Sequence, residues 1–464
     1  MTGERIPERV HLIGIGGVHM SAIARILRAW GHAVSGSDQK ASATTARMEE
    51  LGVRVAIGHA PENIGGAQLV VTTSAATFWD NPEIAEARRR AIPVIKRAEM
   101  VARLMEGRYS IAVAGTHGKT TTSGLIAHML VAAGLDPTYL IGGEVRSLGT
   151  NAAAGEGRYI VVEADEFDRA FLSYTPDVAV ITNIEPDHLD IYGTVDELER
   201  AFTQFAASTP ADGHLIACAD DARVRALVGA GTGIRAGDVQ TYALDHDATW
   251  TAGASRFGER GQTFDVRRSG RGIGAFTIEL PGRHNVSNAL AGIAAGSTVG
   301  IGPEVMRAAL ASYRGAQRRF EYVGDAAGVT VMDDYAHHPT EVRTTVAMAR
   351  ERFDGRRLVV VFQPHTYTRT AYLLDEWKTC FEGIDALYIA ETYAARETPD
   401  AGLSGAELAA AIVAPPATYA GTLDEAAERI ARDLRAGDVF FTVGAGDVER
   451  VGPKVIAKLR RGGA

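Results

Sequence analysis

The feature that most constrains the fold is a repeated order of short apolar run, glycine-containing turn and segment with helical periodicity. In the first example, the run Val10 to Ile15 contains Gly14 and is followed by Gly16 and Gly17, and apolar residues then follow at helical spacing up to Trp30. Comparable apolar runs recur at 109–114, 178–181, 358–362 and 439–443. Runs of this kind, alternating with helices, are typical of βαβ units. We therefore predict an α/β protein built on parallel sheets.

The order of run, turn and helix begins afresh near residues 108 and 316. We therefore predict three domains, at 1–107, 108–315 and 316–464. The length of 464 residues agrees with this number, at about 150 residues per domain. We expect a Rossmann-like N-terminal domain, a central domain like a P-loop ATPase with a parallel sheet, and a Rossmann-like C-terminal domain.

Composition excludes several classes of protein. With 46% hydrophobic and 23% charged residues, the chain is not a disordered one. Cys218 and Cys380 are its only cysteines, which excludes a disulfide framework and favours a reducing compartment. The net charge of −9 argues against nucleic acid as a partner. The first residues are polar and the apolar runs are short, so we expect a cytoplasmic monomer or homodimer with no membrane partner.

The strongest motif is a glycine loop between the run at 109–114 and a predicted helix from Lys119 to about Ala133. Its residues are Gly115, Thr116, His117, Gly118, Lys119, Thr120 and Thr121. Backbone amides of such a loop cradle phosphates, the lysine reaches the β- and γ-phosphates and the hydroxyl holds Mg²⁺. Val113 stands where the standard Walker sequence has its first glycine, so this loop is shorter. The alternative is an ordinary turn with a surface lysine.

A second glycine loop lies near the N-terminus, at Gly14, Ile15, Gly16 and Gly17. It resembles a dinucleotide fingerprint, with Asp38 placed where an acidic residue contacts a ribose. The third glycine of that fingerprint is replaced by His19, which counts against NAD. There are two other interpretations. In one, the loop is a site for another nucleotide diphosphate, and in the other, it is a tight turn that binds nothing.

Polar clusters follow four of the predicted strands. The run Glu163 to Glu166 offers carboxylates for Mg²⁺, and His188 follows the next strand, although a solvated acidic loop and a structural histidine are the alternatives. Two further clusters, at 333–339 and 363–369, lie in the third predicted domain. Their spacing fits neither a zinc site nor a Ser-His-Asp triad.

Taken in order along the chain, these segments resemble the Mur ligase family, and 280–285, 319–321 and 444–447 add further matches. The resemblance spans nearly the whole chain. It implies an ATP-dependent ligase of peptidoglycan synthesis that joins L-alanine to the carboxylate of UDP-N-acetylmuramate through an acyl phosphate, with release of ADP and phosphate. The three domains would bind the UDP-sugar, ATP and the amino acid, in that order.

The resemblance also implies the residues of each site. The ATP site would combine loop 115–121 with His284, Asn285, Asn288, Arg319 and Asp334. The UDP-sugar site would combine Gly14, Ile15, Gly16 and Gly17 with Ser35, Asp38 and Ser74. Tyr335, His337 and Arg369 would bind L-alanine, and Thr120, Glu163 and His188 would hold Mg²⁺. The catalytic set would be Lys119, Glu163, His188, His337 and Arg369.

Three residues depart from the usual family pattern: His19 replaces a glycine, Phe167 a serine and Thr366 an arginine. The nearest alternative function is a recycling ligase that joins UDP-N-acetylmuramate to a tripeptide. Segments 186–190 and 363–365 favour the alanine-adding type. Two alternatives of other classes are an NAD-dependent dehydrogenase, from the first glycine loop, and a binding protein without catalysis.

Overall fold

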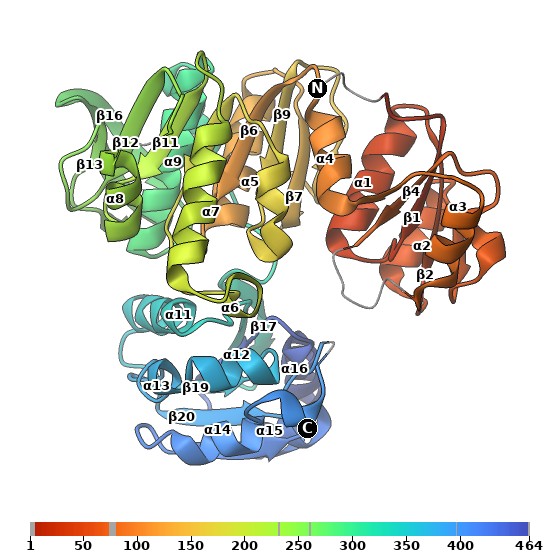
Figure 1. Ribbon diagram of the computed structural model, residues 1–464. Helices are drawn as coiled ribbons and strands as arrows, with labels where there is room; N and C mark the ends of the chain where they lie inside the picture. The colour runs from red at the N-terminus through yellow and green to blue at the C-terminus, as the bar shows by residue number, and fades with distance from the viewer. Residues whose placement is uncertain (1–4, 74–79, 231–232, 259–260, 396, 463–464) are drawn as a thin grey trace. The chain divides into compact units, whose positions relative to one another are not determined.

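The computed structural model describes residues 5–73, 80–230, 233–258, 261–395 and 397–462 (Figure 1). The chain divides into two compact units, 1–316 and 317–464. The first unit contains two sheets and the second contains one. In the described part of the chain, no helix has the length and apolar character needed to cross a membrane.

The first sheet is fully parallel, with the order β3-β2-β1-β4-β5. Its strands are β1 (Arg9–Ile13), β2 (Ala33–Asp38), β3 (Arg54–Ile57), β4 (Leu69–Thr72) and β5 (Val94–Lys96), and its helices are α1 (Val18–Ala29), α2 (Ala43–Glu50), α3 (Pro82–Arg89) and α4 (Arg97–Met105). Alternate residues of β1 enter different cores, Leu12 beside α1 and Ile13 beside α3. From β1 the chain adds strands first on one side (β2, β3) and then on the other (β4, β5), so the first glycine loop lies at a topological switch point, where such sheets bind ligands.

The central sheet has the order β14-β15-β13-β12-β11-β10-β6-β9-β7-β8, and β16 pairs with β15. Its strands are β6 (Tyr109–Ala114), β7 (Thr138–Val145), β8 (Thr150–Ala153), β9 (Tyr159–Glu163), β10 (Val178–Ile181), β11 (His214–Cys218), β12 (Asp238–Ala243), β13 (Trp250–Ala252), β14 (Arg256–Gly258), β15 (Gly261–Arg268) and β16 (Arg271–Ile278). Strands β9, β6 and β10 are parallel neighbours, which brings their carboxyl ends to one edge.

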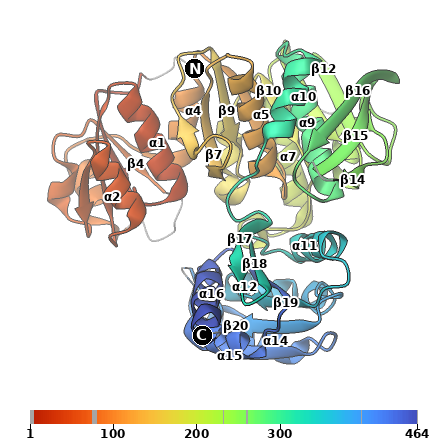
Figure 2. The ribbon, with the colours of Figure 1, turned by 180° about the vertical axis from the view of Figure 1, so that it is seen from behind.

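Helices cover both faces of this sheet. They are α5 (Lys119–Ala132), α6 (Leu189–Tyr192), α7 (Val195–Ser208), α8 (Ala222–Ala230), α9 (Arg283–Thr298) and α10 (Pro303–Ser312). Ile111 and Val113 of β6 join the core under α5 and α9, whereas Ala112 and Ala114 join the core under α7. Accordingly, α7 lies in front of the sheet in Figure 1, and α9 and α10 lie in front of it in Figure 2.

The second unit has a sheet of order β17-β18-β22-β19-β20-β21. Its strands are β17 (Glu321–Ala326), β18 (Val329–Asp334), β19 (Leu358–Phe362), β20 (Ala386–Ala390), β21 (Ala417–Gly421) and β22 (Val439–Val443), and only β17 is antiparallel to its neighbour among the described strands. The helices are α11 (Pro339–Arg352), α12 (Tyr367–Tyr372), α13 (Leu374–Trp377), α14 (Gly405–Ala411), α15 (Leu423–Asp433) and α16 (Val451–Gly462). The predicted α/β class with parallel sheets is confirmed.

Candidate active site

The glycine loop after β6 has two positions whose backbone conformation or surroundings favour glycine. Gly118 has a φ of 84° at the N-cap of α5, and Gly115 has a φ of 137°. A Cβ atom on Gly115 would lie 1.9 Å from the Thr182 hydroxyl oxygen, so any side chain would collide. The loop therefore turns sharply from strand to helix and presents the N-terminus of α5 at the edge of the sheet.

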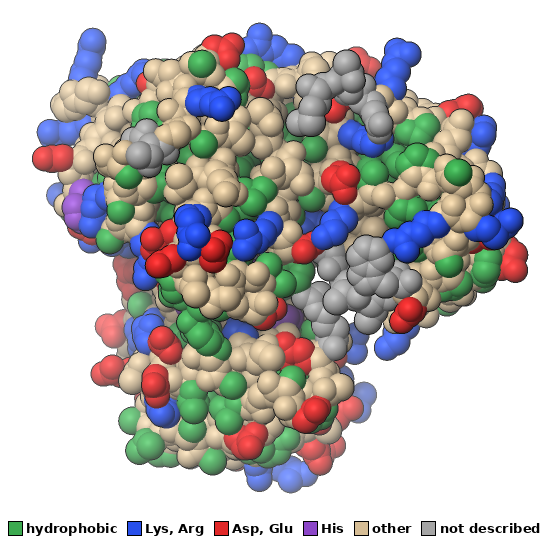
Figure 3. Space-filling view, viewed as in Figure 1, with side chains coloured by type: hydrophobic (Ala, Val, Ile, Leu, Met, Phe, Trp, Pro, Cys, Tyr) green, Lys and Arg blue, Asp and Glu red, His purple; other side chains and the backbone are tan. Residues whose placement is uncertain are grey.

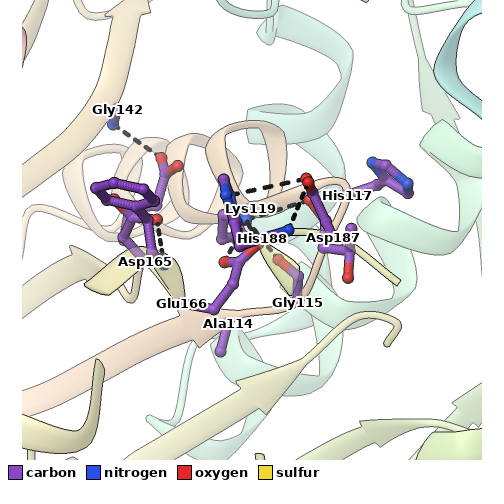
Figure 4. Close-up of polar contacts among 12 residues, drawn as sticks. Ala114, Gly115, His117, Lys119, Gly142, Asp165, Glu166, Asp187 and His188 are labelled. Carbon is purple, nitrogen blue, oxygen red and sulfur yellow. Dashed lines mark hydrogen bonds and ion pairs between the residues drawn. The ribbon is translucent and has the colours of Figure 1, made fainter. Parts of the chain in front are cut away.

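Lys119 lies at the centre of this edge (Figure 4). Its Nζ donates to the backbone oxygens of Gly115 (2.6 Å) and Thr116 (3.1 Å) and to both carboxylate oxygens of Glu166 (3.0 and 2.7 Å). Burial alone would lower the pKa of Lys119, but the carboxylates of Glu166 and its neighbours outweigh burial and raise that pKa. The lysine is therefore a fixed positive charge.

Thr120 and Glu163 form the second part of the edge. The Thr120 hydroxyl donates to the two Glu163 carboxylate oxygens at 3.2 and 2.9 Å, and the amide of Gly142 donates to one of them at 2.8 Å. Burial raises the pKa of Glu163, and the charge of Lys119 opposes that rise. A hydroxyl and a carboxylate side by side at the phosphate loop are oxygen donors of the kind that Mg²⁺ prefers.

His188 joins the same edge from the end of β10. It has a φ of 52° at the N-terminus of α6, and its ring contacts Phe167 edge-on at 5.1 Å between centroids. Ligand atoms of His188, Asp187 and Glu166 lie within 4.8 Å of one another. The structure thus groups His188 with Glu166, a member of the predicted acidic run, and with Asp187.

The acidic loop after β9 is also tied to the first sheet's helices. Arg97, at the start of α4, pairs with Asp165 at 3.2 Å, and the neighbouring Lys96 pairs with Asp168 at 2.9 Å. Burial, and then the charge of Arg97, lowers the pKa of His19 to about 4. His19, the residue that departs from the family's glycine, is therefore neutral at pH 7, and its Nε2 is buried without a hydrogen-bond partner.

One of the three predicted adenine-side residues, Asn288, lies directly against the phosphate loop, and Asn285 bonds to it. Asn288 of α9 accepts a hydrogen bond from the Thr122 hydroxyl at 3.3 Å and donates to Asn285 at 3.3 Å. A Cβ atom on Gly118 would lie 2.5 Å from the Asn288 side-chain oxygen, which shows how closely α9 approaches the loop. His284 is the adjacent residue and is half-buried.

The first glycine loop is bonded to the carboxyl end of β2, where the amides of Gly14 and Ile15 donate to the Ser37 backbone oxygen. The amide of Gly16 donates to the Asp38 carboxylate at 2.9 Å, so Asp38 is held at the loop. The Ser35 hydroxyl and the His11 Nδ1 share a hydrogen bond of 2.9 Å. The side chain of Ile15 is fully buried in the core beside α1, so Ile15 can contribute only backbone groups to a site at this loop. Ser74 lies outside the described residues.

In the second unit, Asp334 ends β18 and is almost completely buried. Its carboxylate accepts hydrogen bonds from the amides of Phe320 (2.7 Å) and Ala336 (2.9 Å) and from the Thr345 hydroxyl (3.1 Å). Burial raises the pKa of Asp334 to about 6, against the charge of Arg319. Asp334 thus anchors the segment that carries Arg319.

The predicted amino-acid residues surround the carboxyl ends of β18 and β19. His337 contacts the Tyr335 ring at 5.3 Å and the His365 ring at 6.0 Å between centroids, and Arg369 contacts His365 at 3.4 Å. Arg319 lies over the Tyr335 ring and 3.5 Å from a Glu341 carboxylate oxygen. The structure therefore brings Arg319, Tyr335, His337 and Arg369 into one region of the second unit.

Several residues of these sites were missed by sequence reasoning. Glu166 carried a signal, because it belongs to the acidic run that follows β9. Arg97 carried none, since its partner Asp165 lies 68 residues further along the chain. Such pairs become visible only when the fold brings the two segments together.

Family models match all three parts of the chain. The "Mur ligase family, catalytic domain" model covers residues 9–109, the "Mur ligase middle domain" model 113–296 and the "Mur ligase, glutamate ligase domain" model 318–446. The chain belongs to the Mur ligase family. This confirms the predicted family and the three-domain α/β architecture, whose central domain carries the phosphate loop.

Two curated relatives and one solved structure share a name, and a second solved structure has a different one. A UDP-N-acetylmuramate–L-alanine ligase of Anaeromyxobacter dehalogenans is 47% identical over 98% of both chains, and one of Roseiflexus castenholzii is 45% identical over 97% of both. The solved UDP-N-acetylmuramate-alanine ligase of Thermotoga maritima is 28% identical, with a TM-score of 0.82 over 98% of this chain and 99% of that one. A murein peptide ligase of Psychrobacter arcticus is 26% identical, with a TM-score of 0.74 over the same shares.

Proposed function

We propose that this Mur ligase uses ATP to join L-alanine to the carboxylate of UDP-N-acetylmuramate, in the synthesis of peptidoglycan precursors. The observation that carries the proposal is the array of Lys119, Thr120 and Glu163 at the phosphate loop. It occurs in a chain that is 47% identical, over 98% of its length, to a ligase of that name. The murein peptide ligase is a less similar relative, so the tripeptide-recycling activity is the weaker candidate.

The proposed reaction has two steps. The muramoyl carboxylate attacks the γ-phosphorus of ATP, which gives an acyl phosphate and ADP. The amine of L-alanine then attacks the acyl carbon, phosphate leaves and an amide bond remains. Phosphoryl transfer depends chiefly on positioning and on neutralising charge, which is what Lys119 and the N-terminus of α5 offer.

We propose that Thr120 and Glu163 hold one Mg²⁺, and that His188 supports a second. When bound, Mg²⁺ would neutralise charge on the phosphates. Asn285 and Asn288, which bond to each other beside the phosphate loop, and His284 next to them, are assigned to the adenine side. In the second unit, Arg319 is assigned to the γ-phosphate. Asp334 is assigned to the ribose, because a carboxylate has lone pairs beyond the three that it already uses.

The remaining residues are assigned to the other two substrates. The turn of Gly14, Ile15, Gly16 and Gly17, whose amides donate to Ser37, Asp38 and Gly14, would bring the N-terminus of α1 to the diphosphate of the UDP-sugar. Ser35, Asp38 and Ser74 would lie nearby. Arg369 would pair with the carboxylate of L-alanine, since a guanidinium fork matches a carboxylate. Tyr335 and His337 would line that pocket. We assign 1–107, 108–315 and 316–464 to the UDP-sugar, ATP and the amino acid, respectively.

We place the reaction in the cytoplasm, with no membrane or nucleic-acid partner and with the enzyme as a monomer or homodimer. Cys218 and Cys380 are both buried free thiols, which supports a reducing compartment.

The decisive experiment measures ADP release with UDP-N-acetylmuramate and, in turn, a panel of amino acids and the cell-wall tripeptide. We expect turnover that requires L-alanine. Turnover with the tripeptide alone would transfer the assignment to the recycling activity. The absence of any nucleotide-dependent turnover would contradict both.

A further inference from the structure

The ammonium group of Lys119 is fully hydrogen-bonded within its own chain. An ammonium group has three protons, and the Lys119 Nζ directs them at two backbone oxygens and at the Glu166 carboxylate. The Glu166 side chain is only 2% exposed, and that of Lys119 is 14% exposed. The pair is therefore a buried salt bridge in which both carboxylate oxygens face the same ammonium.

Glu166 has little freedom to follow the lysine if it moves. The Tyr192 hydroxyl donates to the Glu166 backbone oxygen at 2.6 Å, which anchors this residue to α6. Two further groups, the Asp187 carboxylate and the His188 ring, have atoms within 4.8 Å of the Glu166 carboxylate. The nearest neighbours of Glu166 other than Lys119 thus include a second negative charge.

Binding of ATP as proposed requires Lys119 to direct its protons at phosphate oxygens. The move would leave Glu166 buried beside Asp187 without a counter-charge, and an unpaired buried carboxylate is strongly destabilising. A cation that takes the place of the lysine would remove this penalty. Carboxylate oxygens of Glu166 and Asp187, together with a ring nitrogen of His188, are a suitable donor set for a divalent cation.

We propose that Glu166 is a positioning residue that exchanges partners. It holds Lys119 when no nucleotide is bound, and it passes to a divalent cation, shared with Asp187 and His188, when Lys119 turns to the phosphates. The proposal rests on the proposed function in one respect only, the binding of ATP at the phosphate loop. Its consequence is that cation binding and nucleotide binding strengthen each other through Glu166, as linked equilibria must.

The test measures the dissociation constant of a non-hydrolysable ATP analogue for the full chain, without the other substrates. Wild type, Glu166→Gln and Asp168→Asn are compared in EDTA and in saturating Mg²⁺. Asp168→Asn is the matched control, because it removes one negative charge from the same loop and Asp168 pairs with the exposed Lys96. Circular dichroism verifies that each variant is folded.

In EDTA, Glu166→Gln should bind the analogue about tenfold more tightly than wild type, because freeing Lys119 no longer strands a buried charge. In Mg²⁺ the difference should shrink, since the cation relieves the same charge in wild type. Asp168→Asn should behave as wild type in both. Asp187→Asn is the second variant, and it should tighten binding in EDTA by a smaller factor, because Glu166 then loses its repulsive neighbour.

Three results would overturn the exchange. The first is equal affinity of Glu166→Gln and wild type in EDTA. The second is a difference that Mg²⁺ does not change. The third is an equal effect of Asp168→Asn, which would indicate general charge repulsion. If no variant binds the analogue at all, the proposed ATP site fails as well, so failure of the exchange alone is recognised by normal binding in wild type.

Discussion

Lys119 is the residue on which the proposed chemistry depends most directly. We expect Lys119→Ala to lower kcat by about 100- to 1000-fold, the effect of removing one fixed donor from a developing charge. The chain should stay folded, because Thr182 and Asn183 hold the loop through hydrogen bonds to His117 that do not involve the lysine. ADP release and circular dichroism test the two parts. Undiminished turnover would contradict the assignment of the phosphate loop.

Glu83 illustrates a buried charge outside the proposed ATP site. It lies on α3, is completely buried, and accepts hydrogen bonds from the Ser37 hydroxyl (2.6 Å) and the Asn63 amide (2.6 Å), with His11 at 3.3 Å. Burial by itself would raise the pKa of Glu83, but these bonds outweigh burial and lower it from 4.5 to about 2. A carboxyl with a depressed native pKa stabilises the fold above pH 4.5 and loses that contribution as the pH falls from 4.5 to 2.

We therefore expect Glu83→Gln to lower the free energy of unfolding at pH 7 by about 3 kcal/mol, at 1.4 kcal/mol per pKa unit. The difference from wild type should be smaller at pH 3, where the wild-type contribution is partly lost. Urea denaturation at the two pH values measures both. Glu86→Gln, on the same helix but only half-buried and paired with the exposed Arg89, is the control and should differ much less from wild type. An equal difference at pH 7 and pH 3 would refute the charge-based account.

At the scale of elements, α12 depends on a distant carboxylate. Thr366 has a φ of 66° just before this helix, and Glu397 accepts hydrogen bonds from the amides of Tyr367 (2.7 Å) and Thr368 (3.0 Å). The Thr368 hydroxyl also donates to Glu397. Glu397 thereby satisfies amides that α12 leaves open at its N-terminus, and it fixes the helix that carries Arg369.

We predict that Glu397→Gln raises KM for L-alanine several-fold, with a smaller effect on KM for ATP, because α12 and with it Arg369 lose their fixed position. The loss of stability should be about 1 kcal/mol, as for other N-terminal caps. Glu407→Gln is a matched control, since Glu407 caps α14, which has no proposed substrate contact. Steady-state kinetics with each substrate varied would reveal the split. Equal changes for all substrates would indicate a general loss of structure.

Elements differ in how well the sequence predicts them, for a physical reason. Strands β6 and β19 coincide with the runs 109–114 and 358–362, because a parallel strand covered on both faces is apolar throughout. Strand β7 was not predicted, since it contains Gly142 and Gly143 and its later residues are only half-buried. Strand β17 was not predicted either, since it is antiparallel, lies at an edge and contains the exposed Tyr322.

The same distinction applies to the candidate site. Four site residues lie at the end of a predicted strand or in the loop after it, so the topology of a parallel sheet places them at one edge: Lys119, Thr120, Glu163 and His188. The partners that hold them were not predictable, because contacts such as Lys119–Glu166 and Tyr367–Glu397 join segments separated by 47 and 30 residues. The sequence pattern predicts which edge is used, and the packing decides which side chains meet there.

At the scale of the whole molecule, the net charge does not favour the proposed substrates, so positive charge must be placed at the sites themselves. A chain with a net charge of −9 is proposed to bind two anionic substrates. Acidic and basic side chains are interspersed over the face drawn in Figure 3. The compensation must therefore come from particular groups, of which Lys119 belongs to the unit 1–316 and Arg319 to the unit 317–464. If both groups serve one ATP, a change in either unit should alter binding of the same nucleotide.

Arg319 is the residue that best tests whether the second unit contributes to ATP binding. We expect Arg319→Ala to lower kcat/KM for ATP by about a hundredfold, because a guanidinium near the γ-phosphate stabilises the charge of phosphoryl transfer. Arg319→Lys should restore only part of the activity, since an ammonium keeps the charge without the planar fork. Arg432→Ala is the control, because Arg432 is exposed and its ion pair with Glu428 is a long contact of 3.9 Å. Wild-type kinetics in Arg319→Ala would mean that the second unit contributes no charge to the γ-phosphate, and that Lys119 and bound cations neutralise it alone.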